Sequence, residues 1–193
     1  MRIWKRLLGT ALCLCAAVCV MSVSASAAEH SHPICGETHT GIGDHTGTCD
    51  NVTWIEVTRA NVTPSNGLKL EDGNSYYLGE NIEVEHAITI KGTVNLCLNG
   101  HSITKTSESG TFAGVITVEP GSSFTLCDCN GSGMGNGKIT HADGVTGRGV
   151  LVGSSSPSSS YRTTFFFMYG GTISGNRING QDGAGVRVHN ASF

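Results

Sequence analysis

The chain has 193 residues, of which 27 are glycine, 14% are charged and 6% are aromatic, and its formal net charge is −3. This charge balance excludes a nucleic-acid-binding protein of the usual basic type. A coiled coil or helical bundle is also excluded, because it would be rich in alanine, leucine, glutamate and lysine, so the composition leaves short strands with many turns, or disorder.

Residues 1–28 have the layout of a secretory signal peptide. Basic residues, including Arg2 and Lys5, precede the apolar run 7–23, and small residues follow it. The apolar run falls short of the ~20 residues that comfortably span a bilayer, so we expect cleavage rather than a membrane anchor. The protein is therefore expected to be secreted or displayed at the cell surface, with the membrane involved only through export.

A polar lead-in, residues 29–74, follows the signal peptide and is rich in histidine and cysteine at its start. Its candidate metal ligands are His30, His32, Cys35, His39, His45 and Cys49. Imidazoles and thiolates are the ligands of tetrahedral Zn²⁺, although the spacing is not that of a standard zinc finger. Because exported thiols usually oxidise, a disulfide between Cys35 and Cys49 is the favoured alternative, and a polar tether whose histidines bind nothing is the third.

From about residue 75 onward, three short apolar segments recur in a fixed order. Two of them repeat at spacings of 34 or 36 residues: Ile103, Ile139 and Ile173, and Val118, Val152 and Val188. Each segment has three to five residues with apolar side chains at alternate positions, which is typical of strands, and glycine and asparagine separate the segments. Stacked short strands with this period predict an all-β fold, a parallel β-helix of about three to four coils over residues 75–193.

The middle segment of each repeat predicts which side chains face the core. It aligns Val94, Phe124 and Phe165, so Phe165 and Phe167 are expected to point inward as Phe124 does. By the same register Phe193 begins a further strand. The β-helix is therefore expected to be incomplete at its C-terminal end, as a fragment or truncated product, because an uncapped coil exposes strand edges.

Three cysteines lie within the repeats. Cys97 and Cys127 occupy equivalent positions on successive coils, and their parallel side chains favour a buried ladder of free thiols over a disulfide. Met168 is expected next in this column. An odd number of cysteines remains after the signal peptide, and Cys129 is expected to be the unpaired thiol at a bend.

Several pieces of the chain resemble right-handed parallel β-helix proteins of the pectate-lyase-like type. Residues 76–78, 88–90 and 94–101 look like a first coil, and residues 126–129 and 168–176 resemble repeats of large secreted or surface β-helix proteins of anaerobic bacteria. The resemblance implies a right-handed parallel β-helix from about residue 75 to the end of the chain. It implies no single activity, because this fold hosts lyases, hydrolases and inert adhesins.

No catalytic residues and no cofactor other than zinc are predicted. Polysaccharide cleavage needs converging carboxylates, but those of the repeats are scattered: Glu83, Glu85, Glu108, Glu119, Asp128, Asp143 and Asp182. Asp128 begins a run like a calcium loop, yet Ile139 stands where the bidentate glutamate belongs. A turn that caps a strand is the expected role of this run.

The sequence therefore favours a non-catalytic, secreted or cell-surface β-helix module that serves as an adhesin, a stalk or a glycan-contacting surface. Its expected partners are polysaccharides or host and cell-surface glycans, with Trp54, Tyr76 and Tyr161 as candidate contacts. One alternative is the N-terminal part of a polysaccharide lyase or glycoside hydrolase whose active site lies on missing coils. The other is metal binding by the histidine and cysteine cluster of the lead-in.

Overall fold

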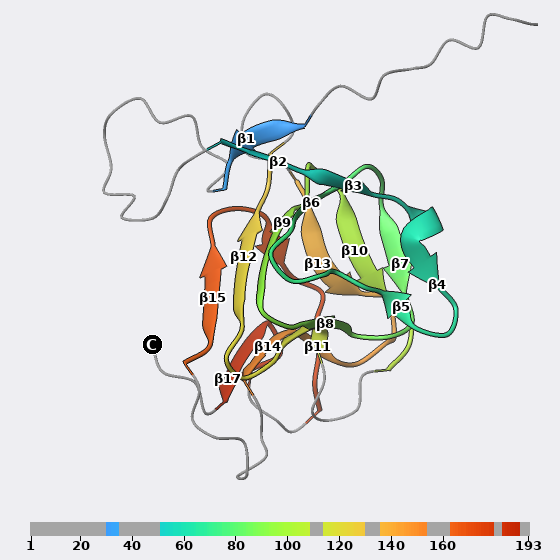
Figure 1. Ribbon diagram of the computed structural model, residues 1–193. Helices are drawn as coiled ribbons and strands as arrows, with labels where there is room; N and C mark the ends of the chain where they lie inside the picture. Colours follow the sequence, from blue (N-terminus) through green and yellow to red (C-terminus); the bar gives the residue numbers. More distant parts are fainter. Residues whose placement is uncertain are drawn as a thin grey trace, which may run out of the picture.

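The computed structural model in Figure 1 shows a protein built almost entirely from short strands. The residues that the structure describes are 30–34, 51–108, 114–129, 136–153, 163–179 and 183–189. Within these ranges the only helix is one short 3-10 helix, η1 (Arg59–Asn61), and every other element is a strand. The all-β class is therefore confirmed. Among the described residues, no helix has the length and hydropathy of a membrane span. The predicted signal peptide lies outside the described residues.

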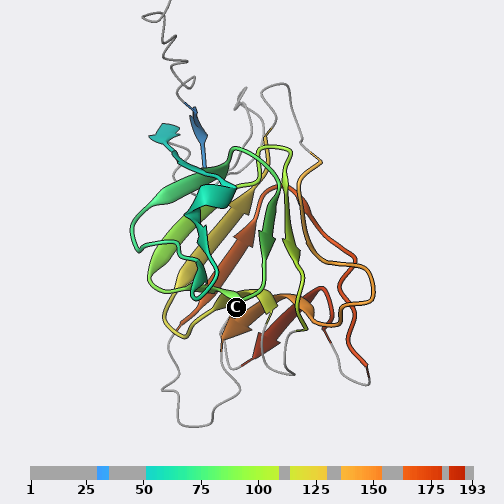
Figure 2. The ribbon, with the colours of Figure 1, turned by 90° about the vertical axis from the view of Figure 1, so that its right-hand side faces the viewer.

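Three parallel sheets surround a shared interior, as Figures 1 and 2 show from two sides. The first sheet contains β7 (Ile82–Val84), β10 (Ser102–Lys105), β13 (Lys138–His141) and β16 (Thr172–Ile173). The second contains β8 (Ile88–Ile90), β11 (Gly114–Val118), β14 (Arg148–Gly153) and β17 (Val186–His189). The third contains β3 (Ile55–Val57), β6 (Ser75–Leu78), β9 (Thr93–Cys97), β12 (Ser123–Cys127) and β15 (Phe165–Met168). From β7 onward the chain visits the three sheets in rotation, which is compatible with the predicted β-helix.

Two short antiparallel strand pairs accompany the three sheets. The N-terminal ribbon consists of β1 (Ser31–Pro33) and β2 (Asn51–Thr53), and the second pair consists of β4 (Val62–Thr63) and β5 (Gly67–Leu68). Figure 1 shows the N-terminal ribbon near one end of the strands of the third sheet. Trp54, which follows β2, packs with Tyr77 of that sheet. The ribbon is therefore attached to the outer face of the third sheet.

Apolar side chains stack in register in the interior. Ile103 pairs with Ile139, and Ile139 pairs with Ile173. Val152 of the second sheet pairs with Val118 on one side and with Val188 on the other. The predicted spacings of 34 and 36 residues therefore mark positions that stack, as expected. Each fully buried aliphatic side chain of this kind contributes roughly 1.5–3 kcal/mol to folding.

The predicted register is wrong for β15, by one residue. Phe166, not Phe165, pairs with Phe124, and the two rings stack with centroids 5.7 Å apart. Phe165 and Phe167 consequently lie on the outer face. The reason is that residues 165–167 are all phenylalanine, so the sequence has no apolar–polar alternation to fix which positions point inward. The same shift pairs Met168 with Leu126, so Met168 does not continue the column of thiols.

Asp128 ties together turns on two coils. This buried carboxylate accepts hydrogen bonds from the backbone N–H groups of Gly100, at 2.7 Å, and Gly137, at 2.8 Å. A Cβ atom at Gly137 would lie only 2.5 Å from the Cβ of Leu98, which explains glycine at this close approach. Asp128 therefore holds two connections together, whereas residues 130–135 of the predicted turn lie outside the described residues.

A buried polar pair lies at the end of the first sheet, where Lys105 of β10 pairs with His141 of β13. The Lys105 ammonium donates hydrogen bonds to the carbonyl of Glu85, at 2.6 Å, and to the hydroxyl of Ser107, at 2.7 Å. His141 Nδ1 lies 2.7 Å from Asn176 Oδ1. Burial lowers the pKa of His141, and the charge of Lys105 lowers it further, against the opposing effect of the Asn176 hydrogen bond.

We predict that His141 makes the fold sensitive to acid. Its folded-state pKa lies below the ordinary value of 6.5, so on acidification the unfolded chain takes up a proton before the folded chain does. The free energy of unfolding should therefore fall as the pH drops below about 6.5, by at most about 1.4 kcal/mol per pH unit for one proton. The measurement is urea unfolding between pH 7.5 and 5 for the wild type and His141→Asn, which keeps a short polar side chain.

His86, which is exposed, supplies the matched control variant His86→Asn. The wild-type and His86→Asn proteins should lose stability in parallel, and His141→Asn should lose less. Equal pH dependence in all three proteins would contradict the role given to His141.

Candidate functional site

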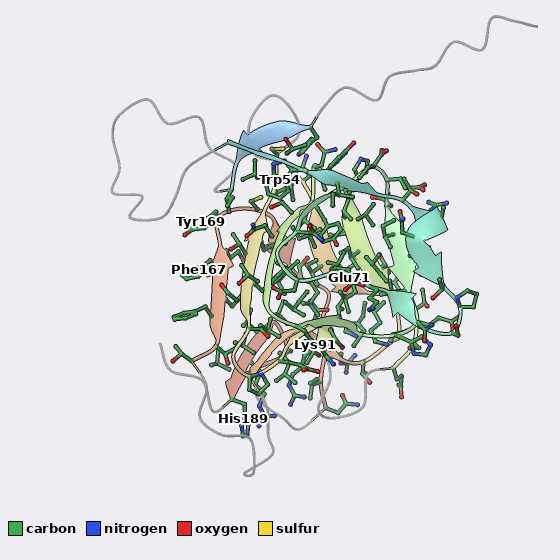
Figure 3. All side chains as sticks on the ribbon, viewed as in Figure 1. Trp54, Glu71, Lys91, Phe167, Tyr169 and His189 are labelled. Atoms are coloured by element: carbon green, nitrogen blue, oxygen red, sulfur yellow. The ribbon has the colours of Figure 1, made fainter. Side chains whose placement is uncertain are left out.

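Three aromatic side chains extend from the outer face at β15 and form what we call the aromatic row: Phe165, Phe167 and Tyr169. Their exposed fractions are 43%, 41% and 38%. Neighbouring rings are nearly parallel, with centroids 5.8 Å apart for Phe165 and Phe167 and 6.3 Å apart for Phe167 and Tyr169. Figure 3 shows Phe167 and Tyr169 pointing away from the third sheet. The row is a linear, solvent-accessible aromatic surface.

The alternation of the strand positions this row. Phe166 points inward onto Phe124, so its neighbours on either side point outward. The backbone N–H of Tyr169 donates a hydrogen bond of 2.8 Å to the carbonyl of Leu126, so the pairing with β12 continues past the end of β15. The row is therefore held by a paired strand rather than by a loop.

Two of the three aromatic residues that the sequence suggested for glycan contact are buried. Trp54 is 4% exposed and Tyr76 is 7% exposed. The Tyr76 hydroxyl accepts a hydrogen bond of 2.9 Å from the backbone N–H of Glu71. Both rings are thus covered by the fold and offer almost no surface to a glycan, whereas Tyr161 lies outside the described residues. Sequence alternation alone missed the aromatic row, because it placed Phe165 and Phe167 in the core.

A groove of about 570 Å³ opens beside β8 and the segment 66–72. Two ion pairs lie along it, Lys69 with Glu71 at 2.9 Å and Lys91 with Glu119 at 3.5 Å; Figure 3 labels Glu71 and Lys91. The hydrogen bond and the charge of Glu71 raise the pKa of Lys69. The volume is in the range of small-molecule sites, and the lining suits polar ligands that exchange hydrogen bonds with carboxylates and ammonium groups.

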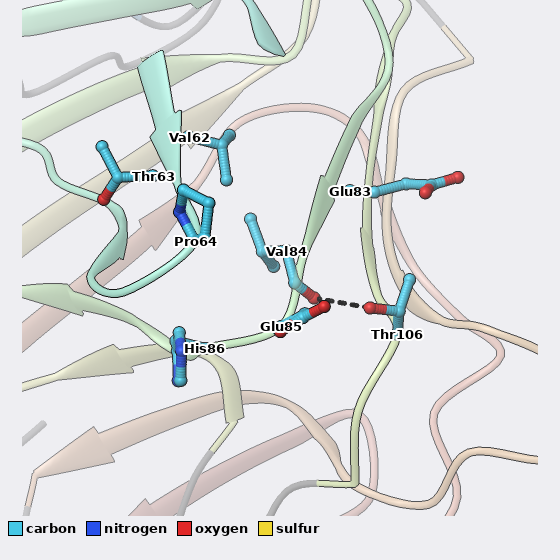
Figure 4. A pocket seen from close by; sticks show the side chains of 8 residues that line it. All are labelled: Val62, Thr63, Pro64, Glu83, Val84, Glu85, His86 and Thr106. Carbon is cyan, nitrogen blue, oxygen red and sulfur yellow. Dashed lines mark hydrogen bonds between the residues drawn. The ribbon is translucent and has the colours of Figure 1, made fainter. Parts of the chain in front are cut away.

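A smaller pocket of about 250 Å³ lies between β4 and β7 (Figure 4). Its apolar walls include Val62 and Val84, and Thr106 donates a hydrogen bond of 3.3 Å to the carbonyl of Val84. Glu83 and Glu85 also line it, but Figure 4 shows Glu83 turned away from Val62. The two carboxylates do not converge on one point, so they form no acid–base pair in this arrangement.

Of the predicted metal ligands of the lead-in, His30 is the one whose side chain is described. Its imidazole stacks on Tyr77, with ring centroids 4.1 Å apart and an angle of 12°, and meets Trp54 edge-on at 6.0 Å. His32 lies in β1. The other predicted ligands lie outside the described residues: Cys35, His39, His45 and Cys49. The disulfide between Cys35 and Cys49 therefore stays a prediction.

The three thiols of the repeats gather at the outer face of the third sheet. Cys97 and Cys127 are in register and fully buried, as predicted, and they pack with Trp54 and Tyr77. Cys129 is not an isolated thiol, because its Sγ lies 3.3 Å from that of Cys97. The hydrogen bond to Cys127, together with burial, raises the pKa of the Cys97 thiol to about 12, although contacts with Cys129 act in the opposite direction.

No family model matches the chain, and no curated protein or solved structure shows significant similarity to it. The fold class and the surfaces described above therefore follow from the residues of this chain and their arrangement.

We predict that two adjacent phenylalanines of β15 differ sharply in their effect on stability. Phe166→Ala removes a partly buried ring from the core and should lower the free energy of unfolding by about 2–4 kcal/mol. Phe167→Ala removes an exposed ring and should change it by at most about 1 kcal/mol. Urea unfolding of the two variants measures this difference. A larger loss of stability for Phe167→Ala would show that Phe165 and Phe167 point inward, as the sequence spacing predicted.

Proposed function

We propose that the chain is a non-catalytic, right-handed parallel β-helix module of the pectate-lyase-like type, secreted or displayed at the cell surface, and that it contacts glycans. The parallel strands paired in register and the resemblance of its sequence pieces support the fold. The exposed aromatic row is the observation that carries the function.

The form of the row favours an extended sugar chain as its ligand. Pyranose rings have apolar C–H faces that pack against aromatic side chains, and exposed aromatic surface of this kind marks interaction sites. Three rings along one strand offer a line of such contacts, and the Tyr169 hydroxyl can exchange a hydrogen bond with sugar hydroxyls. Residues 165–169 contain no charged side chain, which favours a neutral glycan over an acidic one.

The groove beside β8 is the described place where an active site of a polysaccharide lyase or glycoside hydrolase would be sought within this chain, although the alternative stated above places that site on missing coils. Glu71, Asp72 and Glu119 all line it. Their geometry favours binding over cleavage, since Glu71 and Glu119 each hold a lysine and Asp72 accepts a 2.7 Å hydrogen bond from the backbone N–H of Thr93. Release of new reducing ends or unsaturated sugars from polysaccharides by the wild type, and its loss in Glu71→Gln, would establish the enzymatic alternative.

We predict that the aromatic row governs glycan binding. The full chain is applied to a glycan array that includes neutral and acidic polysaccharides, and the best ligand is then titrated. Replacing Phe165, Phe167 and Tyr169 together by serine should weaken binding at least tenfold, which is about 1.4 kcal/mol, because the apolar contact surface is lost.

The matched control replaces two other exposed apolar residues, Ile55 and Val186, by serine. This variant should bind as the wild type does. A wild type that binds no glycan, or a serine variant of the row with unchanged affinity, would refute the proposal, and a preference for acidic glycans would refute the predicted choice of ligand.

A further inference from the structure

We propose that His30, Cys97 and Cys129 form a binding site for a thiophilic divalent metal ion, with Zn²⁺ as the expected occupant. We call this the His30–thiol site. His30 Nε2 lies 3.7 Å from Cys129 Sγ, and Cys129 Sγ lies 3.3 Å from Cys97 Sγ. The three donor atoms all lie within 4.8 Å of one another.

These separations match the edges of a tetrahedral zinc site. With Zn–S bonds of about 2.3 Å and Zn–N bonds of about 2.0–2.1 Å, two sulfurs lie about 3.8 Å apart, and a sulfur and a nitrogen lie about 3.5 Å apart. The separations of 3.3 Å between the sulfurs and 3.7 Å between His30 Nε2 and Cys129 Sγ therefore differ from these edges by about half an ångström or less. The third separation, between the His30 imidazole and Cys97 Sγ, is at most 4.8 Å, so a side-chain rotation that shortens it would bring all three donors to bonding distance of one ion.

The imidazole of His30 is held in place by aromatic neighbours. Its face lies against Tyr77 and its edge meets Trp54, while the backbone N–H of Trp54 donates a hydrogen bond of 3.2 Å to the His30 carbonyl. These contacts fix both the backbone and the ring of His30 beside the thiols. A ligand oriented in advance loses little conformational freedom when the metal binds.

The site is partly buried and partly open to solvent. Cys97 is fully buried, whereas His30 and Cys129 are partly exposed. An ion can therefore reach the site from solvent at the His30 side and is then covered by Trp54 and Tyr77. The three protein donors leave one position of a tetrahedron for a water molecule or a further donor.

The donor set determines the class of metal. Two thiolates and one imidazole favour Zn²⁺ and other thiophilic ions, whereas Ca²⁺ and Mg²⁺ need oxygen ligands. The site also differs from the one expected in the lead-in, because it shares only His30 with that ligand set. It joins residue 30 to thiols on two coils, and His30 and Cys129 are 99 positions apart in the sequence. Metal binding would thus clamp the N-terminal ribbon to the third sheet.

The site is tested with Co²⁺ and Zn²⁺ on the full chain with reduced thiols. Co²⁺ should bind with the visible bands of tetrahedral coordination and the near-ultraviolet bands of thiolate ligands, and excess Zn²⁺ should displace it. Zn²⁺ should also raise the melting temperature, since a ligand at 100 times its Kd stabilises a protein by about 2.7 kcal/mol.

Four variants separate this site from its competitors. Cys129→Ser and His30→Phe should each weaken Co²⁺ binding at least 100-fold, and phenylalanine keeps a ring on Tyr77 so that folding is preserved. Cys127→Ser, at a buried neighbour outside the donor set, and the double variant Cys35→Ser/Cys49→Ser should bind as the wild type does.

Three results would overturn the proposal. The first is a reduced wild-type protein that binds no Co²⁺. The second is loss of binding in the double variant with retention in Cys129→Ser, which would place the metal in the lead-in. The third is a disulfide between Cys97 and Cys129 that persists in the folded protein under reducing conditions, because its sulfurs could not ligate a metal as thiolates.

Discussion

The stacking of inward-pointing side chains from one coil onto the next is the constraint on which the structure depends. No three- to five-residue strand can bury its apolar face alone, so each relies on the strand before and after it in the same sheet. Ile139 illustrates this, since it lies between Ile103 and Ile173. Because side chains alternate along a strand, fixing the inward positions also fixes the outward ones. The aromatic row and the thiols are thus consequences of the core.

Polar groups at the bends keep the coils in register. Asp128 receives N–H groups from two turns, and Asn99, in a left-handed conformation with φ of 50°, donates a hydrogen bond of 3.0 Å to the carbonyl of Leu78. The contacts with Gly100 and with Leu78 each join a bend to the preceding coil, so a shift of one coil would leave these polar groups unpaired. The abundance of glycine and asparagine is explained by these bends, where backbone conformation and close approach limit the choice of residue.

The sequence was a reliable guide where apolar and polar residues alternate. The isoleucine and valine columns could be predicted from their regular spacing and because most of these positions have polar neighbours, as Ile103 has in Ser102 and Thr104. Three consecutive phenylalanines have no such pattern. The length and course of the connection before β15 therefore determine which of these side chains point inward. The His30–thiol arrangement could not be predicted either, because His30 reaches Cys129 through the packing of a ribbon that is distant in sequence. The spacing of residues along the chain does not predict a contact of this kind.

The outer face of the third sheet explains how one surface can carry two different chemistries. Tyr77 and Cys97 are in register there, as are Cys97 and Cys127, and the small thiol side chains leave room for Trp54 and His30 to pack over them. On β15 the outward positions are instead large aromatic rings, which remain partly exposed. Trp54 packs over the thiols but the rings of β15 remain open to solvent, so the face has a covered part and an open part. The proposed metal site lies in the covered part and the proposed glycan surface in the open part, and the same core positions the residues of both.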